Sequence, residues 1–242
     1  MLYLGATPLP RSAPNWPHRF AQLAAQSRVP LLQNYYATGM VSAQTPLVDA
    51  PLMALDLETT GLDPRCHGIV SIGIVPLTTT RIFSSEAKQW LVKPRFQLTS
   101  SSVKIHRITD SALEHAPDLL EVLPEFLAAI AGKVLIVHCA DIERQFLAAA
   151  MQVRLQESIY FPVIDTMAIE AQWHRKTPMS LWQRLRKRQA VSIRLAASRA
   201  RYGLPPYLPH HAVTDAMACA ELFIAQVAHR YDTTTPLGSL WT

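Results

Sequence analysis

The sequence predicts an α/β domain in which helices flank a mixed sheet, and three observations support that fold class. The chain has 242 residues, of which 49% are hydrophobic, enough to bury one sizeable core. Short turns join the first three apolar runs, which favours antiparallel strands. Two later apolar runs bracket a helical pattern, as in a βαβ unit, which favours parallel strands.

The strands are short apolar runs bounded by turn residues. Residues 52–58, 69–77 and 88–92 form the antiparallel group. The strands of the βαβ unit are expected at 133–137 and 162–165. Helices follow from the spacing of apolar residues, and we expect them near 19–27, 105–114, 118–131, 141–155 and 212–231.

The domain organisation follows from these elements. We expect an N-terminal extension over residues 1–48, packed on a catalytic domain over 49–232, and a C-terminal tail over 233–242. Residues 173–201, expected to be helical in pieces, hold nine Lys or Arg and no Asp or Glu. The whole chain carries +5, so removing these nine charges leaves −4 elsewhere. This basic segment is either an anion-binding surface or a solvated helix face.

Composition also limits the cellular setting. The sequence has no apolar run of eighteen residues, and its start lacks the charged-then-apolar order of a secretory signal. Cys66, Cys139 and Cys219 are widely spaced and form no CxxC pair, which argues against disulfides and a zinc site. We therefore expect a cytoplasmic protein.

The first candidate site lies on the first strand. Asp56 and Glu58 are two residues apart, so a strand places both side chains on one face, close enough to share a cation. A D-x-E pair is also found at strand ends as solvated acids. Burying two ionised carboxylates in an apolar strand is costly, and a hard cation such as Mg²⁺ offsets that cost.

The second candidate site lies where a strand leads into a helix. On helical spacing, Glu143 shares a face with the apolar Phe146 and Leu147, whereas Asp141 shares one with Arg144. Glu143 is therefore expected to point inward and Asp141 outward. Asp141 is interpreted as the N-cap of this helix.

The third candidate site combines His210, on a proline-bounded loop, with Asp215, five residues later in the first turns of a helix. This arrangement suits a division of labour in which the aspartate holds a metal ion and the histidine takes a proton from attacking water. The alternative is a surface histidine beside an aspartate that the helix dipole favours.

Together, the D-L-E-T-T-G run at 56–61, the H-R-I-T run at 106–109 and the H-x-x-x-x-D pattern at 210–215 resemble the DEDDh, or DnaQ-like, exonuclease family. That family includes the proofreading epsilon subunit of bacterial replicative DNA polymerase. The resemblance covers about residues 50–230 and implies a ribonuclease H-like fold with a mixed five-stranded sheet flanked by helices.

The resemblance also implies the roles of the site residues. Asp56, Glu58, Glu143 and Asp215 would bind two Mg²⁺ or Mn²⁺ ions, and His210 would act as the general base. The family's second motif usually reads H-N-x-x-F-D, so this chain has Glu143 in place of Asp. Glutamate is one methylene longer and still reaches a metal after a small shift of the helix.

Substrate contacts are implied less directly. By resemblance, Thr59 and Thr60 would lie along the terminal nucleotide, and His106 with Ile108 would bracket its base. The aromatic residues of the basic segment and its end either stack on single-stranded bases or belong to the core; these are Trp173, Trp182 and Tyr202.

The expected function is a metal-dependent 3′-5′ exonuclease that releases nucleoside 5′-monophosphates from nucleic acid ends, with single-stranded DNA as the expected substrate. A proofreading, repair or turnover role is open, and a DNA polymerase is a candidate partner. Two alternatives remain, an RNA 3′-end trimming enzyme of the same family and a non-catalytic module that binds nucleic acid or a polymerase.

Overall fold

The computed structural model describes residues 14–95, 108, 113–175 and 191–242. A five-stranded sheet has the order β3-β2-β1-β4-β5. Its strands are β1 (Leu52–Thr59), β2 (Ile69–Leu77), β3 (Lys88–Leu91), β4 (Val134–Val137) and β5 (Val163–Asp165).

The sheet is mixed, as the turn lengths predict. β1 pairs antiparallel with β2, and β2 pairs antiparallel with β3. β4 runs parallel to both β1 and β5, and the chain between β4 and β5 forms the expected βαβ crossover. The predicted α/β fold with a mixed five-stranded sheet is thus confirmed.

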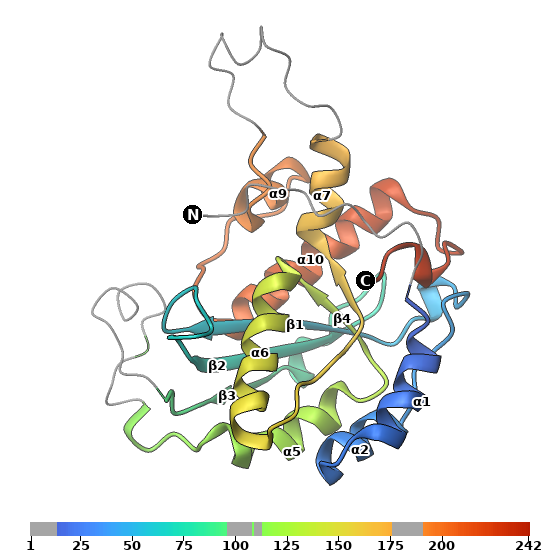
Figure 1. Ribbon diagram of the computed structural model, residues 1–242. Coiled ribbons are helices and arrows are strands. Elements are labelled where there is room, and N and C mark those ends of the chain that lie inside the picture. Colours follow the sequence, from blue (N-terminus) through green and yellow to red (C-terminus); the bar gives the residue numbers. More distant parts are fainter. Residues whose placement is uncertain (1–13, 96–107, 109–112, 176–190) are drawn as a thin grey trace, which may run out of the picture.

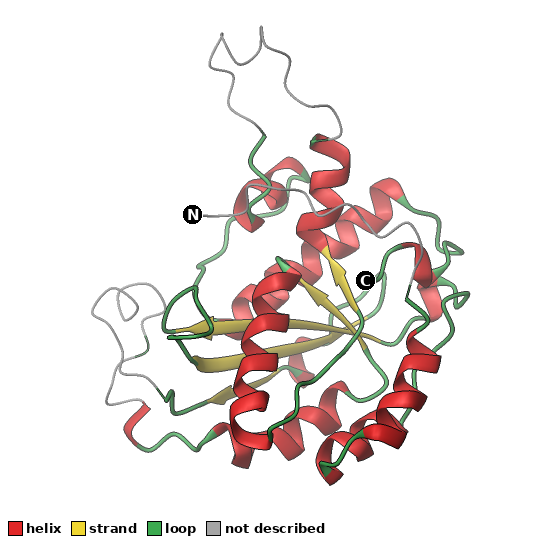
Figure 2. Ribbon diagram, viewed as in Figure 1, coloured by secondary structure: helices red, strands yellow, loops and turns green. Residues whose placement is uncertain are grey.

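Helices cover both faces of the sheet (Figures 1 and 2). The α-helices of the described residues are α1 (Trp16–Gln26), α2 (Pro30–Ala37), α5 (Leu119–Ile130), α6 (Ala140–Leu155), α7 (Thr166–His174), α9 (Leu195–Arg201) and α10 (Ala212–Arg230). α6 crosses the near face of the sheet in Figure 1 and α10 lies behind it. Because both faces are covered, the central strand β1 is almost continuously apolar and buried.

The helix ends show how the sequence sets these elements. α5 begins with a capping box in which the side chain of Asp118 accepts a backbone hydrogen bond and the side chain of Glu121 bonds back to the backbone N–H of Asp118. The same Asp118 carboxylate pairs with Arg154 near the end of α6, at 2.8 Å for both N–O distances. One acidic residue therefore caps α5 and ties it to α6.

Both terminal regions pack on this core. Phe20 and Tyr36, from α1 and α2, are buried in it, and Trp241 near the C-terminus is 1% exposed. The segments before β1 and after α10 also lie side by side, since Leu47 N–H donates to Thr235 O at 2.9 Å. The domain bounds 1–48, 49–232 and 233–242 stay a prediction.

The structure differs from the predicted local structure at the start of α6 and in two helices. Asp141 is not an N-cap, because α6 begins at Ala140 with Cys139 at the cap position, so Asp141 lies within the first turn. α2 and α7 are absent from the predicted helices. Of the predicted helix at 105–114, only residues 108, 113 and 114 lie within the described residues.

In the part of the chain that the structure describes, no helix combines the length and the apolar character needed to cross a bilayer.

Candidate active site

Strand β1 presents two acidic side chains on one face, as its period requires. Asp56 lies opposite Gly73 of β2, and Glu58 lies opposite Ser71. Glu58 is 8% exposed and Asp56 is partly buried. A shift of register between Glu58 and Thr59 interrupts the ladder. Such irregularities are common next to functional sites, where they redirect a side chain.

Helix α10 brings the third carboxylate, Asp215, to this strand. Its first turn passes directly over Gly73, where an added Cβ would lie 2.3 Å from the carbonyl carbon of Ala212. Only glycine allows this close approach of helix and sheet backbones. Asp56 lies opposite Gly73 in the sheet, so the absence of a side chain at Gly73 lets α10 bring Asp215 close to Asp56.

The three carboxylates form a compact group. Oxygen atoms of Asp56, Glu58 and Asp215 all lie within 4.8 Å of one another. Burial raises the pKa of Asp56 well above its usual value, and the charges of Asp215, Glu143 and Glu58 add to the effect. Burial, together with Asp215, raises the pKa of Glu58 to about 7. The group is thus electrostatically unfavourable without a cation, and its oxygen donors suit a hard divalent ion.

Glu143, on α6, is the fourth predicted ligand, and its surroundings give a further test of whether a cation fits. Its side chain is 3% exposed, and its Oε2 is buried without a hydrogen-bond partner. Burial raises its pKa to about 8. Glu143 is not among the three carboxylates grouped within 4.8 Å, but its charge acts on Asp56. As expected, Glu143 points inward and Asp141 is exposed.

Asp165, at the end of β5, positions the start of α6. Its carboxylate accepts the backbone N–H groups of Cys139 and Ala140, both at 3.0 Å, and that of Met167 at 2.8 Å. It therefore caps the N-termini of α6 and α7 together, and each such cap contributes about 1 kcal/mol. Cys139 has a positive φ of 100°, so these bonds hold a strained turn directly before the helix that carries Glu143.

His210 lies on the loop that enters α10. Its φ is 71° and its side chain is exposed. Its backbone N–H donates to Asp215 Oδ2 at 2.6 Å, and the N–H of His211 donates to the same oxygen at 3.1 Å. Asp215 thus fixes the backbone at His210 and leaves the imidazole on the solvent side.

The turn after β1 contains two of the predicted substrate contacts. Thr59 Oγ1 donates to Gly61 O at 2.7 Å. Thr60 is 2% exposed, and its Oγ1 accepts the backbone N–H of Gly68 and contacts His67 Nδ1 at 3.2 Å. The Thr60 hydroxyl therefore stabilises the turn that connects β1 to β2. Ile108 is partly buried, and His106 lies outside the described residues.

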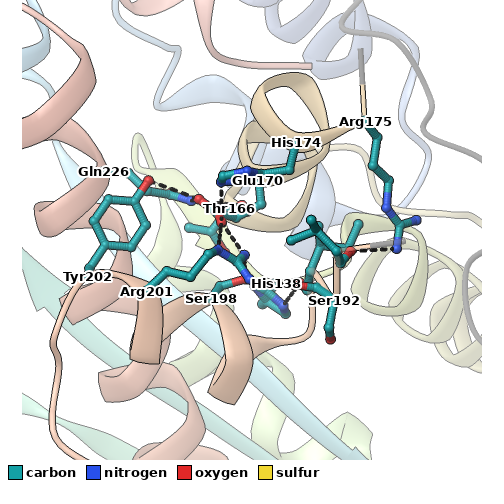
Figure 3. Close-up of polar contacts among 12 residues, drawn as sticks. His138, Thr166, Glu170, His174, Arg175, Ser192, Ser198, Arg201, Tyr202 and Gln226 are labelled. Atoms are coloured by element: carbon teal, nitrogen blue, oxygen red, sulfur yellow. Dashed lines mark hydrogen bonds and ion pairs between the residues drawn. The ribbon is translucent and has the colours of Figure 1, made fainter. Parts of the chain in front are cut away.

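His138, from the second motif, does not join the carboxylates. Its ring contacts Thr166 Oγ1 at 2.8 Å and the carbonyl of Ile193 at 3.1 Å. Burial lowers the pKa of His138, which favours a neutral ring. Figure 3 shows it among polar residues of α7, α9 and α10. His138 therefore joins the end of β4 to the segment that precedes α9.

The centre of that polar group is Glu170 of α7, which is fully buried. Its carboxylate pairs with Arg201 and accepts hydrogen bonds from Tyr202 and Gln226, at 2.9 and 3.0 Å (Figure 3). Burial alone would raise the pKa of Glu170, but these partners hold it below its usual value. The sequence reasoning missed this group, because its members are dispersed between residues 138 and 226.

Two of the four basic residues in the described part of the basic segment, Arg199 and Arg201, pair with acidic side chains of the protein. Arg199 is 2% exposed, and Arg201 is the partner of Glu170. Trp173 is 43% exposed beneath the guanidinium of Arg230, which lies 4.7 Å from its ring. Tyr202 is bonded to both Glu170 and Arg230. Trp182 and residues 176–190 lie outside the described residues.

Comparison with known proteins identifies the class. The family model RNase_T, described as Exonuclease, matches residues 53–223, and the chain belongs to this family. The chain is similar to the DNA polymerase III subunit epsilon of Treponema pallidum, with 30% identity over 176 residues, which are 73% of this chain and 76% of that protein. It is also similar to the PolC-type DNA polymerase III of Thermotoga maritima, with 30% identity, but spans only 12% of that chain.

Solved structures show the same fold. The nuclease domain of 3'hExo, a DEDDh family member bound to rAMP, matches with a TM-score of 0.60 and 18% identity, covering 74% of this chain and 92% of that one. The E. coli ExoI–ssDNA complex matches with a TM-score of 0.60 and 13% identity, covering 75% and 41%. Within the exonuclease class, the chain is therefore a member of the DnaQ-like, DEDDh-type 3′-5′ exonuclease family, which uses divalent metal ions.

Gly73→Ala tests the approach of α10 to the sheet. The new Cβ would collide with the backbone of Ala212, so we expect a loss of about 1–3 kcal/mol in stability and a large loss of exonuclease activity. Thermal unfolding and a nuclease assay measure both. Gly68→Ala is the matched control, because its Cβ meets no atom closer than 3.5 Å. A Gly73→Ala protein as active as wild type would contradict this role.

The raised carboxyl pKa values predict how stability depends on pH. In the unfolded chain Glu58 and Glu143 ionise near 4.5, but in the fold they ionise at about 7 and about 8. Between these limits the folded state binds more protons, so their contribution to stability falls as pH rises from about 4.5 to about 8.

A divalent cation replaces those protons. We therefore expect Mg²⁺ to raise the unfolding temperature more at pH 8 than at pH 5, relative to EDTA. Thermal unfolding followed by circular dichroism at both pH values measures this. Equal effects of Mg²⁺ at pH 5 and pH 8 would show that these carboxylates do not bind the ion.

Proposed function

We propose that this protein is a metal-dependent 3′-5′ exonuclease that releases nucleoside 5′-monophosphates from single-stranded DNA ends. The observation that carries the proposal is the group of Asp56, Glu58 and Asp215, with the charge of the buried Glu143 acting on Asp56 and one Glu143 oxygen, Oε2, without a hydrogen-bond partner. The 30% identity to DNA polymerase III chains favours DNA, a polymerase as partner and a cytoplasmic location.

In this proposal Asp56, Glu58, Glu143 and Asp215 hold two Mg²⁺ or Mn²⁺ ions. Bound there, the ions supply charge neutralisation and Lewis acidity at the scissile phosphate. The chain's own contribution is to preorganise four carboxylates. Burial, with repulsion from neighbouring acids, raises the pKa of Asp56, Glu58 and Glu143. That repulsion is relieved when a cation binds, so the site favours the loaded state.

His210 is the proposed general base. A ring nitrogen would accept the proton of the attacking water, a role that suits an exposed imidazole on a loop. The hydrogen bond from its backbone to Asp215 ties the loop at His210 to the carboxylate group. Thr59, Thr60, His106 and Ile108 remain the proposed contacts to the terminal nucleotide.

The test is a gel time course of 5′-labelled single-stranded DNA and RNA of equal sequence, with Mg²⁺, Mn²⁺ or EDTA. We expect a ladder that shortens from the 3′ end of DNA and is abolished by EDTA. Faster shortening of RNA would favour the RNA-trimming alternative. Intact substrate in every lane, with a folded protein, would favour the non-catalytic binding module.

Glu143 and Asp141 form a matched pair of acids two residues apart on α6, one buried and one exposed. We expect Glu143→Ala to lower the cleavage rate by at least about 100-fold, since removing a catalytic metal ligand has effects of this order. Asp141→Ala should keep the wild-type rate. Equal rates for the two variants would remove Glu143 from the proposed site.

Asp56→Ala separates catalysis from binding. An enzyme would lose cleavage together with metal affinity, whereas a binding module would keep its affinity for DNA and its biological effect. Filter binding with and without Mg²⁺, beside the cleavage assay, distinguishes the two. Undiminished cleavage by Asp56→Ala would overturn the proposed mechanism.

A further inference from the structure

Arg199 of α9 is buried in a place that no sequence motif predicts. Its side chain is 2% exposed, although arginine is almost never fully buried unless it is paired. It belongs to the basic segment at residues 173–201. Burying a guanidinium is costly unless its charge and its N–H groups are satisfied, so its contacts indicate which parts of the protein this arginine holds together.

The two terminal nitrogens of this guanidinium bind different parts of the chain. Nη1 donates to the backbone O of Ala218 on α10 at 2.8 Å, and it lies 2.5 Å from a carboxylate oxygen of Glu221 on the same helix. Nη2 donates to the backbone O of Pro205 at 3.0 Å. Because the guanidinium is planar and rigid, these contacts join the loop at Pro205 to α10.

The loop at residues 203–211 connects α9 to α10 and has few backbone bonds of its own. Three of its residues are prolines, which lack a backbone N–H. Among the described residues, no backbone-to-backbone hydrogen bond involves residues 205–209. Arg199 stabilises the loop instead, since it binds the carbonyl of Pro205 and its guanidinium lies 4.9 Å from the centre of the Tyr207 ring.

The far end of this loop carries His210, the proposed general base. His210 has a φ of 71°, which is uncommon for a residue other than glycine and persists only where the surroundings enforce it. The backbone N–H groups of His210 and His211 donate to Asp215 Oδ2, which holds this end. The loop is therefore held near its start by Arg199 and at His210 by Asp215.

Arg201, on the same helix, provides an internal comparison. It is also paired with a carboxylate, that of Glu170 on α7, and it also donates to a backbone carbonyl, that of Ser192, at 2.6 Å. These bonds join α9 to α7 and to the segment before α9, and none of them reaches residues 203–211. An acidic partner is thus common to both arginines, whereas the contact with the loop belongs to Arg199.

We propose that Arg199 is a positioning residue of the active site, which holds the loop at 203–211 against α10 and thereby sets where the His210 imidazole lies relative to Asp215. Its contacts with Pro205 and Tyr207 lie five and three residues before His210, so their loss would free the chain that leads to the base. The inference rests on the proposed function, because it takes His210 as the general base.

The experiment compares Arg199→Lys with Arg201→Lys in the full chain. Each lysine keeps a positive charge beside its acidic partner, but an ammonium group lacks the planar fork that binds several acceptors at once. Cleavage of 5′-labelled single-stranded DNA gives kcat, the KM for DNA and the Mn²⁺ concentration for half-maximal rate. Hydrogen exchange followed by mass spectrometry gives the protection of the peptide over residues 203–211.

We expect Arg199→Lys to lower kcat at saturating Mn²⁺ by about 10-fold, a part of the roughly 10²–10⁴-fold that a well-placed general base contributes. The KM for DNA and the Mn²⁺ dependence should stay close to wild type, because the carboxylates are unchanged. Exchange in the loop peptide should become faster. Arg201→Lys should keep the wild-type kcat and the wild-type exchange in this peptide. A purely structural role for Arg199 would lower the unfolding temperature and leave kcat unchanged.

Arg199→Met is the second variant, and it removes the charge and every donor while leaving Glu221, whose side chain is 38% exposed, in contact with water. We expect at least the same loss of kcat, with a lower unfolding temperature because two carbonyls lose their donor.

A wild-type kcat or wild-type loop exchange in Arg199→Lys, in a background where the wild-type protein cleaves DNA, would overturn this inference alone. An equal loss of kcat in both lysine variants would overturn it as well, because the effect would then come from α9 as a whole. A folded wild-type protein that does not cleave the DNA would overturn the proposed function, and this inference with it.

Discussion

Repulsion among the carboxylates of Asp56, Glu58 and Asp215 is the constraint on which the rest of the structure depends. Their oxygens lie within 4.8 Å of one another, and burial raises the pKa of Asp56 and Glu58. Such a group is unfavourable unless packing elsewhere enforces it. β1 enforces the first pair through its ladders to β2 and β4, and α10 enforces the third by passing over Gly73.

Two aspartates near helix N-termini, Asp165 and Asp215, accept backbone hydrogen bonds that position residues of the candidate site. Asp165 caps α6 and so fixes the turn before Glu143. Asp215 bonds to the backbone of its own helix start and so fixes the loop at His210. A free N–H at a helix start attracts a negative charge, so each carboxylate stabilises its helix while it positions a residue of the site. Asp215 has both roles, as a cap and as a proposed metal ligand.

Two ion pairs, each with one buried side chain, connect the helices α7, α9 and α10. Glu170 with Arg201 joins α7 to α9, and Arg199 with Glu221 joins α9 to α10. Each pair joins a buried side chain to a partly exposed one, and removing the exposed partner would leave a buried charge without its counterion, which is costly. Two arginines of the basic segment thus have acidic partners within the protein, and whether the segment forms an anion-binding surface stays a prediction.

The sequence by itself determined the mixed sheet, most strand bounds and the inward direction of Glu143, because period and turn length are local properties of the chain. It also located Asp56, Glu58 and Asp215, since strand spacing and the H-x-x-x-x-D pattern are local too. It placed the cap of α6 wrongly at Asp141, because the true partner of that turn is Asp165, on another strand.

Only the tertiary structure decided which distant residues meet. The need for glycine at 73, the burial of Arg199 and Glu170, and the stacking of Arg199 on Tyr207 all depend on where α9 and α10 pack against the sheet. No spacing along the chain encodes such contacts. A buried charge or a close backbone approach is recognisable only once its partner, tens of residues away, has been placed in space.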